Sequence, residues 1–392
     1  MTVLVTPDEM LAAEQATIAA GTSSEVLMRR AAEAIAGWLD RRVATDRGTA
    51  RKIVGLVGPG NNGGDALVTL GILSTMGWRC QALLVHRNAF GELPMSDAER
   101  SGITTTSAPE LEDVDIILDG VFGFRSRASL PPEVASLFQR VAAARAARPV
   151  PVVAVDVPSG IDAGSGAADD DALRADATLC LGLPKLGLTR EPAATLTGEL
   201  VTIDIGIAPP ALGADRPRLL DAETIVPLLP RRRATAHKHG AGAVLIVGGA
   251  PTYYGAPRLS AEAALRAGAG LVAAAAPEQI VPVLAAQVPE TVVVPLEPAG
   301  QIRAIERFVA ERGASIRAMV VGPGLGRSGV ATALLAGLLS GQASPAVRQL
   351  TKVVDADALN WMSDLAEPPT GLIPESAALT PHPGELSRLL GI

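Results

Sequence analysis

The feature that most constrains the fold is a succession of short, almost uninterrupted apolar runs separated by segments with helical periodicity. The first series is KIVGLVG, CQALLV, DIILDGVFG, VPVVAVDVPSG, ATLCLG and LVTIDIG, and the second is AVLIVGG, LVAAAAP, ETVVVPL, AMVVGPG and TKVVDADAL. Strands of this kind are buried on both faces, so they predict parallel sheets covered by helices on either side. The sequence therefore predicts two α/β domains, residues 1–210 and 231–392, joined by a linker over residues 211–230.

Composition excludes several classes of protein. The 392 residues are 48% apolar, and 34 basic against 41 acidic residues give a net charge of −7 without a basic patch for nucleic acid. Cys80 and Cys180 each stand alone in an apolar run, so we expect neither disulfides nor a cysteine zinc site, and a cytoplasmic location. The N-terminus lacks an export signal, and no apolar stretch reaches membrane length without a break. We expect a homo-oligomer with no nucleic-acid or membrane partner.

Two sequence patterns near the N-terminus predict the starts of helices. Thr6-Pro7-Asp8-Glu9 has the pattern of a capping box with proline in the first turn, and this helix should end near Gly21. Thr22-x-x-Glu25 predicts a second box and a second helix. Apolar residues recur at helical spacing in that helix and should face inward: Leu27, Ala31, Ala34, Ile35 and Trp38.

The stretch GPGNNGGD, Gly58 to Asp65, has the glycine spacing of a dinucleotide-binding loop and follows a predicted strand. The acid expected about 20 residues further on is absent, because the next strand ends in His86 and Arg87. A Walker loop is also excluded, since its Gly-Lys-Ser/Thr positions read Gly64-Asp65-Ala66, which puts an acid in place of the phosphate-binding lysine. The loop must serve another purpose.

Polar residues stand at four predicted strand ends in the first domain. They are Asn61 to Asp65, Asp119, Asp156 with Ser159, and Lys185. Alone, each is explained by a turn, a helix cap or a surface position. Because the carboxyl ends of parallel strands meet at one rim of a sheet, together they indicate a binding site.

These motifs, in this order, resemble the YjeF N-terminal family of NAD(P)H-hydrate epimerases over about residues 1 to 210. The second domain resembles the ribokinase-like NAD(P)H-hydrate dehydratases, through HKHGAGAVLIVGG, YYGAPRLSAEAALRAGAG, GPGLG, VVDADALN and TPHPGE. The resemblance implies a Rossmann-like three-layer domain followed by a ribokinase-like α/β domain. It also implies a bifunctional enzyme that epimerises the R and S hydrates NADHX or NADPHX and dehydrates the S form with ADP.

Site residues in the first domain follow from the same resemblance. Potassium ligands would be Asn62, Asp119 and Ser159, whose oxygens suit a hard cation. Asp65 would cap the following helix or hold the loop's shape. Substrate contacts would come from two loops and one strand end: Asn61, Asn62, Gly63, Gly64, Asp65, Gly123, Phe124, Arg125, Ser126, Arg127 and Asp156.

Asp156 is the candidate general acid or base, with Lys185 sharing the proton or stabilising charge; the alternative for Asp156 is a helix cap. The family often has Gly-Thr-Gly where this chain has Gly123-Phe124-Arg125, which leaves substrate contacts there open. Arg125 could instead meet a phosphate.

In the second domain the resemblance assigns Ala256, Gly324, Gly326 and His382 to the substrate site, with Asp355 near the same rim. Magnesium would accompany ADP. The family places a catalytic Asp in a Gly-Thr-Gly-Asp segment well beyond HPGE, and the chain ends seven residues after Glu385. We therefore expect an incomplete second domain with little or no dehydration.

Two other functions remain open from the sequence. One is a non-catalytic scaffold, which the joint presence of Asn62, Asp119, Asp156 and Lys185 disfavours. The other is a ribokinase-like small-molecule kinase, which HPGE and YYGA disfavour.

Overall fold

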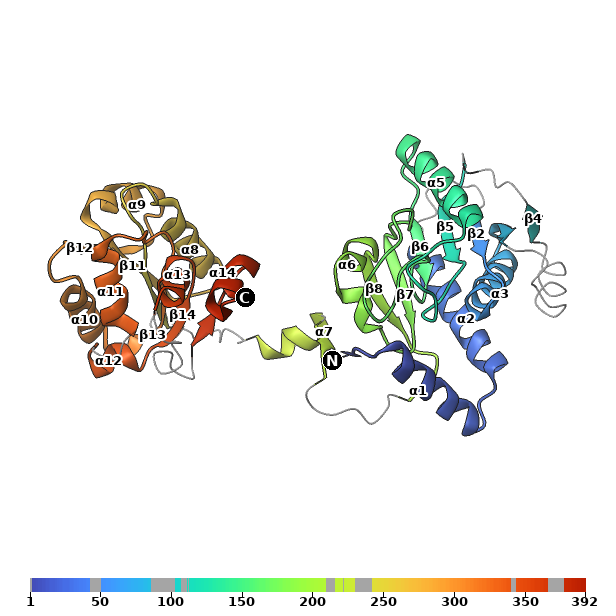
Figure 1. The fold of residues 1–392 in the computed structure, drawn as a ribbon, viewed down its shortest axis with the longest axis horizontal. Coiled ribbons are helices and arrows are strands. Elements are labelled where there is room, and N and C mark those ends of the chain that lie inside the picture. The colour runs from blue at the N-terminus through green and yellow to red at the C-terminus, as the bar shows by residue number, and fades with distance from the viewer. Residues whose placement is uncertain are drawn as a thin grey trace. The chain divides into compact units, whose positions relative to one another are not determined.

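The computed structural model describes residues 2–42, 51–85, 103–106, 111, 113–208, 216–220, 222–229, 242–339, 343–365 and 377–392. The chain divides into two compact units, Met1–Leu229 and Pro230–Ile392. Figure 1 shows that each is a sheet flanked by helices. The two α/β folds predicted from the apolar runs are confirmed.

The first unit is built on a seven-stranded sheet in the order β4-β3-β2-β5-β6-β7-β8, in which every neighbouring pair is parallel. All six predicted runs form strands, and the short β4 was not foreseen. The strands are β2 (Lys52–Val57), β3 (Arg79–Leu84), β4 (Thr104–Thr106), β5 (Ile116–Gly120), β6 (Val152–Val155), β7 (Ala177–Leu181) and β8 (Glu199–Ile203). Strand order reverses between β2 and β5, which is where open α/β sheets bind ligands.

Helices cover both faces of this sheet. On one face α1 (Pro7–Ala19), α2 (Ser24–Arg42) and α3 (Asn61–Thr75) share a core with alternate strand residues such as Ile53 and Val57. On the other face α5 (Pro132–Ala147) packs on the intervening residues, such as Val54 and Leu56. The short η2 (Leu186–Thr189) and α6 (Ala193–Leu196) follow β7.

The helix starts near the N-terminus agree with the sequence in one case and differ in the other. Thr6 caps α1 with the full capping box and proline in the first turn, and α1 ends at Ala19, as predicted. The box predicted for α2 is wrong by one residue. Ser23, not Thr22, caps that helix, because the Ser23 hydroxyl accepts the Val26 N–H at 3.3 Å.

The N-terminal strand ties distant segments together. β1 (Thr2–Val3) pairs antiparallel with β9 (Arg218–Leu219), within the segment predicted as a linker. That segment also contains α7 (Ala222–Ile225) and η3 (Val226–Leu228). Val5 continues inward and bridges Lys185: the Val5 N–H donates to the Pro184 carbonyl at 3.1 Å, and the Leu186 N–H donates to the Val5 carbonyl at 2.8 Å.

The second unit holds a six-stranded parallel sheet in the order β12-β11-β10-β13-β14-β15. The strands are β10 (Ala243–Val247), β11 (Leu271–Pro277), β12 (Val292–Leu296), β13 (Ile316–Val321), β14 (Thr351–Val354) and β15 (Ala378–Leu379). Its helices are α8 (Gly255–Arg266), α9 (Val281–Gln287), α10 (Gln301–Arg312), α11 (Gly329–Leu339), α12 (Pro345–Arg348), α13 (Asp357–Ser363) and α14 (Pro383–Leu390), with η4 (Glu278–Ile280) and η5 (Gly313–Ser315). Within the described part of the chain, no helix has both the length and the apolarity needed to cross a bilayer.

Candidate functional site

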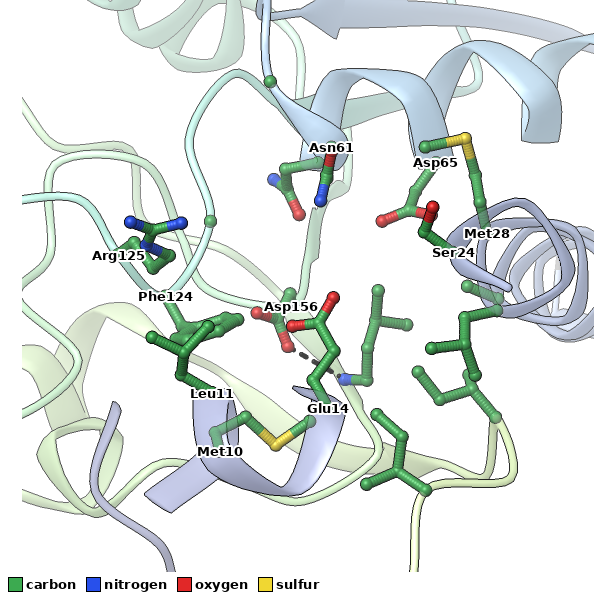
Figure 2. Close-up of a pocket in the computed structure, with 18 of the residues that line it drawn as sticks. Met10, Leu11, Glu14, Ser24, Met28, Asn61, Asp65, Phe124, Arg125 and Asp156 are labelled. Atoms are coloured by element: carbon green, nitrogen blue, oxygen red, sulfur yellow. Dashed lines mark hydrogen bonds between the residues drawn. The ribbon is translucent and has the colours of Figure 1, made fainter. Parts of the chain in front are cut away.

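A cavity of about 660 Å³ opens at the switch point of the first unit. Its walls come from the loop after β2, the loop after β5, the ends of β6 and β7, and helices α1 and α2 (Figure 2). This volume lies within the range of ordinary small-molecule sites.

The glycine loop shapes the cavity through close backbone packing. Gly60 is the N-cap of α3, so the helix begins at Asn61. A Cβ on Gly58 would lie 1.8 Å from the Val121 carbonyl oxygen, and one on Gly63 would lie 1.7 Å from the Gly58 carbonyl oxygen. Only glycine therefore lets the β2 loop, the β5 loop and α3 meet this closely.

Asp65 does not cap α3, which corrects one of the two roles expected for it. It lies in the second helical turn, lines the cavity and is 7% exposed. Burial, with smaller contributions from Asp156 and Glu14, raises the pKa of the Asp65 carboxyl well above its usual value. A buried carboxyl of this kind facing a cavity is typical of a functional site.

Asp119, Ser159 and Asn62 meet around the start of the β5 loop. The buried Asp119 carboxylate accepts the Ser159 N–H at 2.8 Å and the Ser159 hydroxyl at 2.7 Å. The same hydroxyl accepts the Phe122 N–H at 2.8 Å, and the Asn62 amide donates to the Phe122 carbonyl at 2.8 Å. Burial raises the pKa of Asp119, against the lowering effect of the Ser159 hydrogen bonds.

Asp156 and Lys185 form a buried ion pair, with side chains 5% and 0% exposed. Asp156 Oδ1 accepts hydrogen bonds from Lys185 Nζ and from the Leu181 N–H, the latter at 3.0 Å. Lys185 Nζ also donates to the Leu181 carbonyl at 3.2 Å and lies 5.2 Å from the centre of the Phe124 ring. The helix-cap alternative for Asp156 does not apply, because its carboxylate binds β7 and Lys185 instead of a helix end.

The backbone of Asp156 is strained. Its φ of 66° lies in the left-handed region, which costs a non-glycine residue on the order of 1–3 kcal/mol. The surrounding hydrogen bonds hold it there, including its own N–H to the Leu179 carbonyl at 2.9 Å. Strain of this kind is concentrated at functional sites because it fixes the direction of a side chain.

The structure brings most of the predicted residues of the first unit to this cavity. The lining includes Asn61, Asn62, Asp65, Gly123, Phe124, Arg125, Ser126, Asp156 and Lys185. Five others, including Asp119, lie outside the lining. Gly63 and Gly64 pack behind it in α3, Arg127 is exposed, and Ser159 supports the β5 loop with Asp119.

Sequence reasoning missed the contribution of α1 and α2. Met10, Leu11, Glu14, Ser24 and Met28 line the cavity (Figure 2). Burial and Asp156 raise the pKa of Glu14, while Lys185 and Arg125 lower it by smaller amounts. One signal was available: Glu14 lies four residues after the buried Met10, so an acid occupies the inward face of a helix.

In the second unit three of the four predicted residues meet. A Cβ on Gly324 would lie 2.8 Å from the Tyr253 carbonyl oxygen and 3.1 Å from Ala256 Cβ, and the Gly326 N–H donates to Asp357 at 2.8 Å. His382 lies after β15 at the same sheet edge, where it caps α14 by accepting the Gly384 N–H at 3.1 Å. Its side chain is 63% exposed. None of these residues lines the nearby cavity of about 160 Å³ found among the described residues.

Comparison with known proteins gives two family matches. Residues 24–187 match the family described as YjeF-related protein N-terminus, and residues 244–392 match NAD(P)H-hydrate dehydratase.

Curated relatives match along most of the chain. The bifunctional NAD(P)H-hydrate repair enzyme Nnr of Moorella thermoacetica is 37% identical over 87% of this chain and 66% of its own length. That of Coxiella burnetii is 34% identical over 100% of this chain and 76% of its own length. Among solved structures, an ADP/ATP-dependent NAD(P)H-hydrate dehydratase from Bacillus subtilis, co-crystallised with ATP and Mg²⁺, is 25% identical. It aligns with a TM-score of 0.32 over 43% of this chain and 55% of that chain.

Proposed function

Because this chain belongs to the family of bifunctional NAD(P)H-hydrate repair enzymes, we propose that its first unit interconverts the R and S forms of NADHX or NADPHX. One observation carries the assignment: a strained, buried Asp156 paired with Lys185 at the wall of a cavity on the switch point. The alignments span about two thirds to three quarters of the relatives' length, at 66% and 76%.

The reaction inverts the carbon that carries the added hydroxyl, C6 of the nicotinamide ring, without oxidation. The ring nitrogen can expel the hydroxyl as water and leave a planar iminium carbon, to which water adds from either face. Such a step requires proton transfer to and from oxygen, which a positioned carboxyl can supply. Asp156 supplies that group, and the Lys185 ammonium holds it in place.

Potassium fits the oxygen-rich cluster beside the cavity. Asn62 and Ser159 carry neutral oxygens, and Asp119 adds a buried carboxylate, which is a donor set suited to a hard cation. When bound, the ion would place a positive charge near the substrate pyrophosphate. Asn62 is the member of this cluster that also lines the cavity, which links the two sites.

The remaining lining residues suit a dinucleotide hydrate. Phe124 offers an aromatic face, and the exposed Arg125 offers a cation that can meet a phosphate. Asn61 and Asn62, in the first turn of α3, line the same cavity, and the N–H groups at a helix start favour an anion.

The second unit matches a family named for dehydration, whereas the sequence predicted little or no dehydration by this chain, and that prediction remains to be tested. We assign the S hydrate to the edge formed by Ala256, Gly324, Gly326 and His382, with ADP and magnesium as co-reactants. The close approach of Gly324 to Tyr253 and Ala256 supports a shared loop cluster there.

The test uses chromatographically resolved R and S hydrates, each incubated with the purified chain. Interconversion of both epimers is expected, and Asp156→Asn should slow it by about 10²–10⁴-fold, the usual contribution of a general acid or base. Circular dichroism would verify that the variant is folded. Addition of ADP and Mg²⁺ measures dehydration separately, as NADH formed from the S hydrate. A folded variant that retains the wild-type rate would remove Asp156 from the mechanism.

A further inference from the structure

We propose that Glu14 of α1 is a second proton-transferring carboxyl of the epimerase site, acting with Asp156 on the oxygen at C6. This inference rests on the proposed function of the first unit. It assigns a role in proton transfer to α1, whereas the sequence motifs pointed only to the glycine loop and the strand ends.

The position of Glu14 is the first argument. Its carboxyl and that of Asp156 project into the same hollow from different elements, α1 and the end of β6 (Figure 2). Glu14 is half-buried, and among the described residues its carboxyl has electrostatic neighbours but no hydrogen-bond donor. A carboxyl held at a cavity wall without a structural partner is free to bind a ligand or transfer a proton.

The engagement of Asp156 is the second argument. Its Oδ1 already accepts hydrogen bonds from Lys185 Nζ and from the Leu181 N–H, so these bonds fix the direction of the carboxyl at the cavity wall. Lys185 is fully buried and directed at Asp156 and the Leu181 carbonyl. Loss of the hydroxyl as water needs a proton donor at the same moment. In the direction in which Asp156 accepts the proton, a second group must therefore donate it.

The charges around Glu14 are consistent with a proton held there. Burial and, to a smaller extent, Asp156 disfavour the ionised form of Glu14 and raise its pKa, while Lys185 and Arg125 act in the opposite direction with smaller effect. The charges of Asp65 and Glu14 also repel each other, and Glu25 lies elsewhere on the cavity lining. Two facing carboxyls that differ in environment divide naturally into an acid and a base.

Epimerisation needs one proton transfer to the departing oxygen and one from the oxygen that returns. Protonated Glu14 gives its proton to the C6 hydroxyl, the C–O bond breaks, and the ring nitrogen lone pair forms the C=N bond as water leaves. Water then adds to the opposite face of C6, the nitrogen recovers its lone pair, and Asp156 takes the proton. In the reverse direction the two carboxyls exchange roles. The pair therefore holds one proton before and after the reaction and none while the iminium carbon is present, and exchange with solvent returns the proton to Glu14 before another turnover in the same direction.

The experiment compares Glu14→Gln, Glu14→Asp and wild type across pH, with Asp8→Asn as control. Asp8 lies on the same helix but is exposed and outside the cavity, so its variant makes the same carboxyl-to-amide change on α1 without touching the site. We expect Glu14→Gln to lower kcat/KM for both epimers by about 10²–10³-fold, within the usual range for acid–base catalysis. The wild-type profile should fall at high pH as the shared proton is lost, and that limb should disappear in Glu14→Gln.

Glu14→Asp keeps the carboxyl and should recover part of the rate together with the alkaline limb. A Glu14→Gln enzyme with a lower rate but unchanged pH limbs would overturn the proposal, because a purely structural role predicts that result. Wild-type kinetics in Glu14→Gln would overturn it as well, while the proposed epimerase function would stand. Absence of interconversion by the wild type would instead overturn both.

Discussion

Substitution of Gly58 by alanine tests whether the glycine loop exists for close packing. The added Cβ would lie 1.8 Å from the Val121 carbonyl oxygen, 2.7 Å from its carbon and 2.9 Å from its Cα. Ordinary contact needs about 3.5 Å, so the β2 and β5 loops must separate by well over 1 Å. That movement would stretch the hydrogen bond from the Gly58 N–H to the Gly120 carbonyl, now 3.1 Å long.

The cost follows from these contacts. Overpacking against rigid backbone destabilises by about 1–3 kcal/mol, and loss of the hydrogen bond adds about 1 kcal/mol. We therefore expect Gly58→Ala to lower the free energy of unfolding of the first unit by about 2–4 kcal/mol. Gly63→Ala should be similarly costly, since its Cβ would meet the Gly58 carbonyl oxygen at 1.7 Å.

Gly60 in the same loop is the matched control. No atom lies within 4 Å of a Cβ at that position, and its φ of −96° suits any residue. Alanine is a poorer N-cap than glycine, but it also restricts the unfolded chain by about 0.4–1 kcal/mol, and the two effects nearly cancel. Gly60→Ala should therefore change the stability by no more than about 0.5 kcal/mol.

Urea denaturation followed by tryptophan fluorescence measures these differences. A Trp361→Phe background restricts the signal to Trp38 and Trp78, the two tryptophans of the first unit. Equal destabilisation by Gly58→Ala and Gly60→Ala would refute the packing argument, because it would show that any side chain in the loop is harmful.

Two further predictions follow from the buried acids. Interconversion should be faster in potassium chloride than in choline chloride of equal ionic strength. Ser159→Ala should raise the potassium concentration that gives half-maximal rate about tenfold, which is equivalent to about 1.4 kcal/mol of binding free energy. Identical rates in the two salts would exclude a role for the ion. Burial raises the pKa of the Asp65 carboxyl above its ordinary value of 3.8, so ionisation of this carboxyl in the folded state opposes folding. The folded protein is therefore most stabilised by Asp65 below pH 3.8, and this stability is lost as the pH rises through the raised pKa. Asp65→Asn should therefore be more stable than wild type at pH 8, with the gain vanishing near pH 3 in urea titrations; a gain independent of pH would contradict this.

The long strands could be predicted because a strand that is buried on both faces consists of consecutive apolar residues. Every apolar run that the sequence marks became a strand, since no other short element hides so many consecutive apolar residues. The missed strands have no such run. β4 is Thr-Thr-Thr, and β1, β9 and β15 are two residues each, so their pairing depends on what lies beside them.

The grouping of polar residues at strand ends was predictable for the same reason. In a parallel sheet the ends of β2, β5, β6 and β7 share one edge, which brought Asn62, Asp119, Asp156 and Lys185 to a common region. The exact position of each side chain relative to the helix ends was less predictable. Asp65 was expected at a helix end, yet α3 starts at Asn61 and carries it one turn further, into the cavity.

The contribution of α1 could not be inferred from local pattern because it depends on contacts between residues far apart in sequence. Val5 is hydrogen-bonded on both sides to the segment around Lys185, and β1 pairs with β9 on the other side. These bonds fix the start of α1 beside the end of β7. Since Glu14 lies about two turns along that helix and Lys185 lies within the bonded segment, the same bonds set the position of both residues in the cavity. The acid on the helix and the ion pair on the sheet are thus parts of one hydrogen-bonded assembly, and a carboxyl placed so firmly beside Asp156 is better explained by a role in proton transfer than by chance.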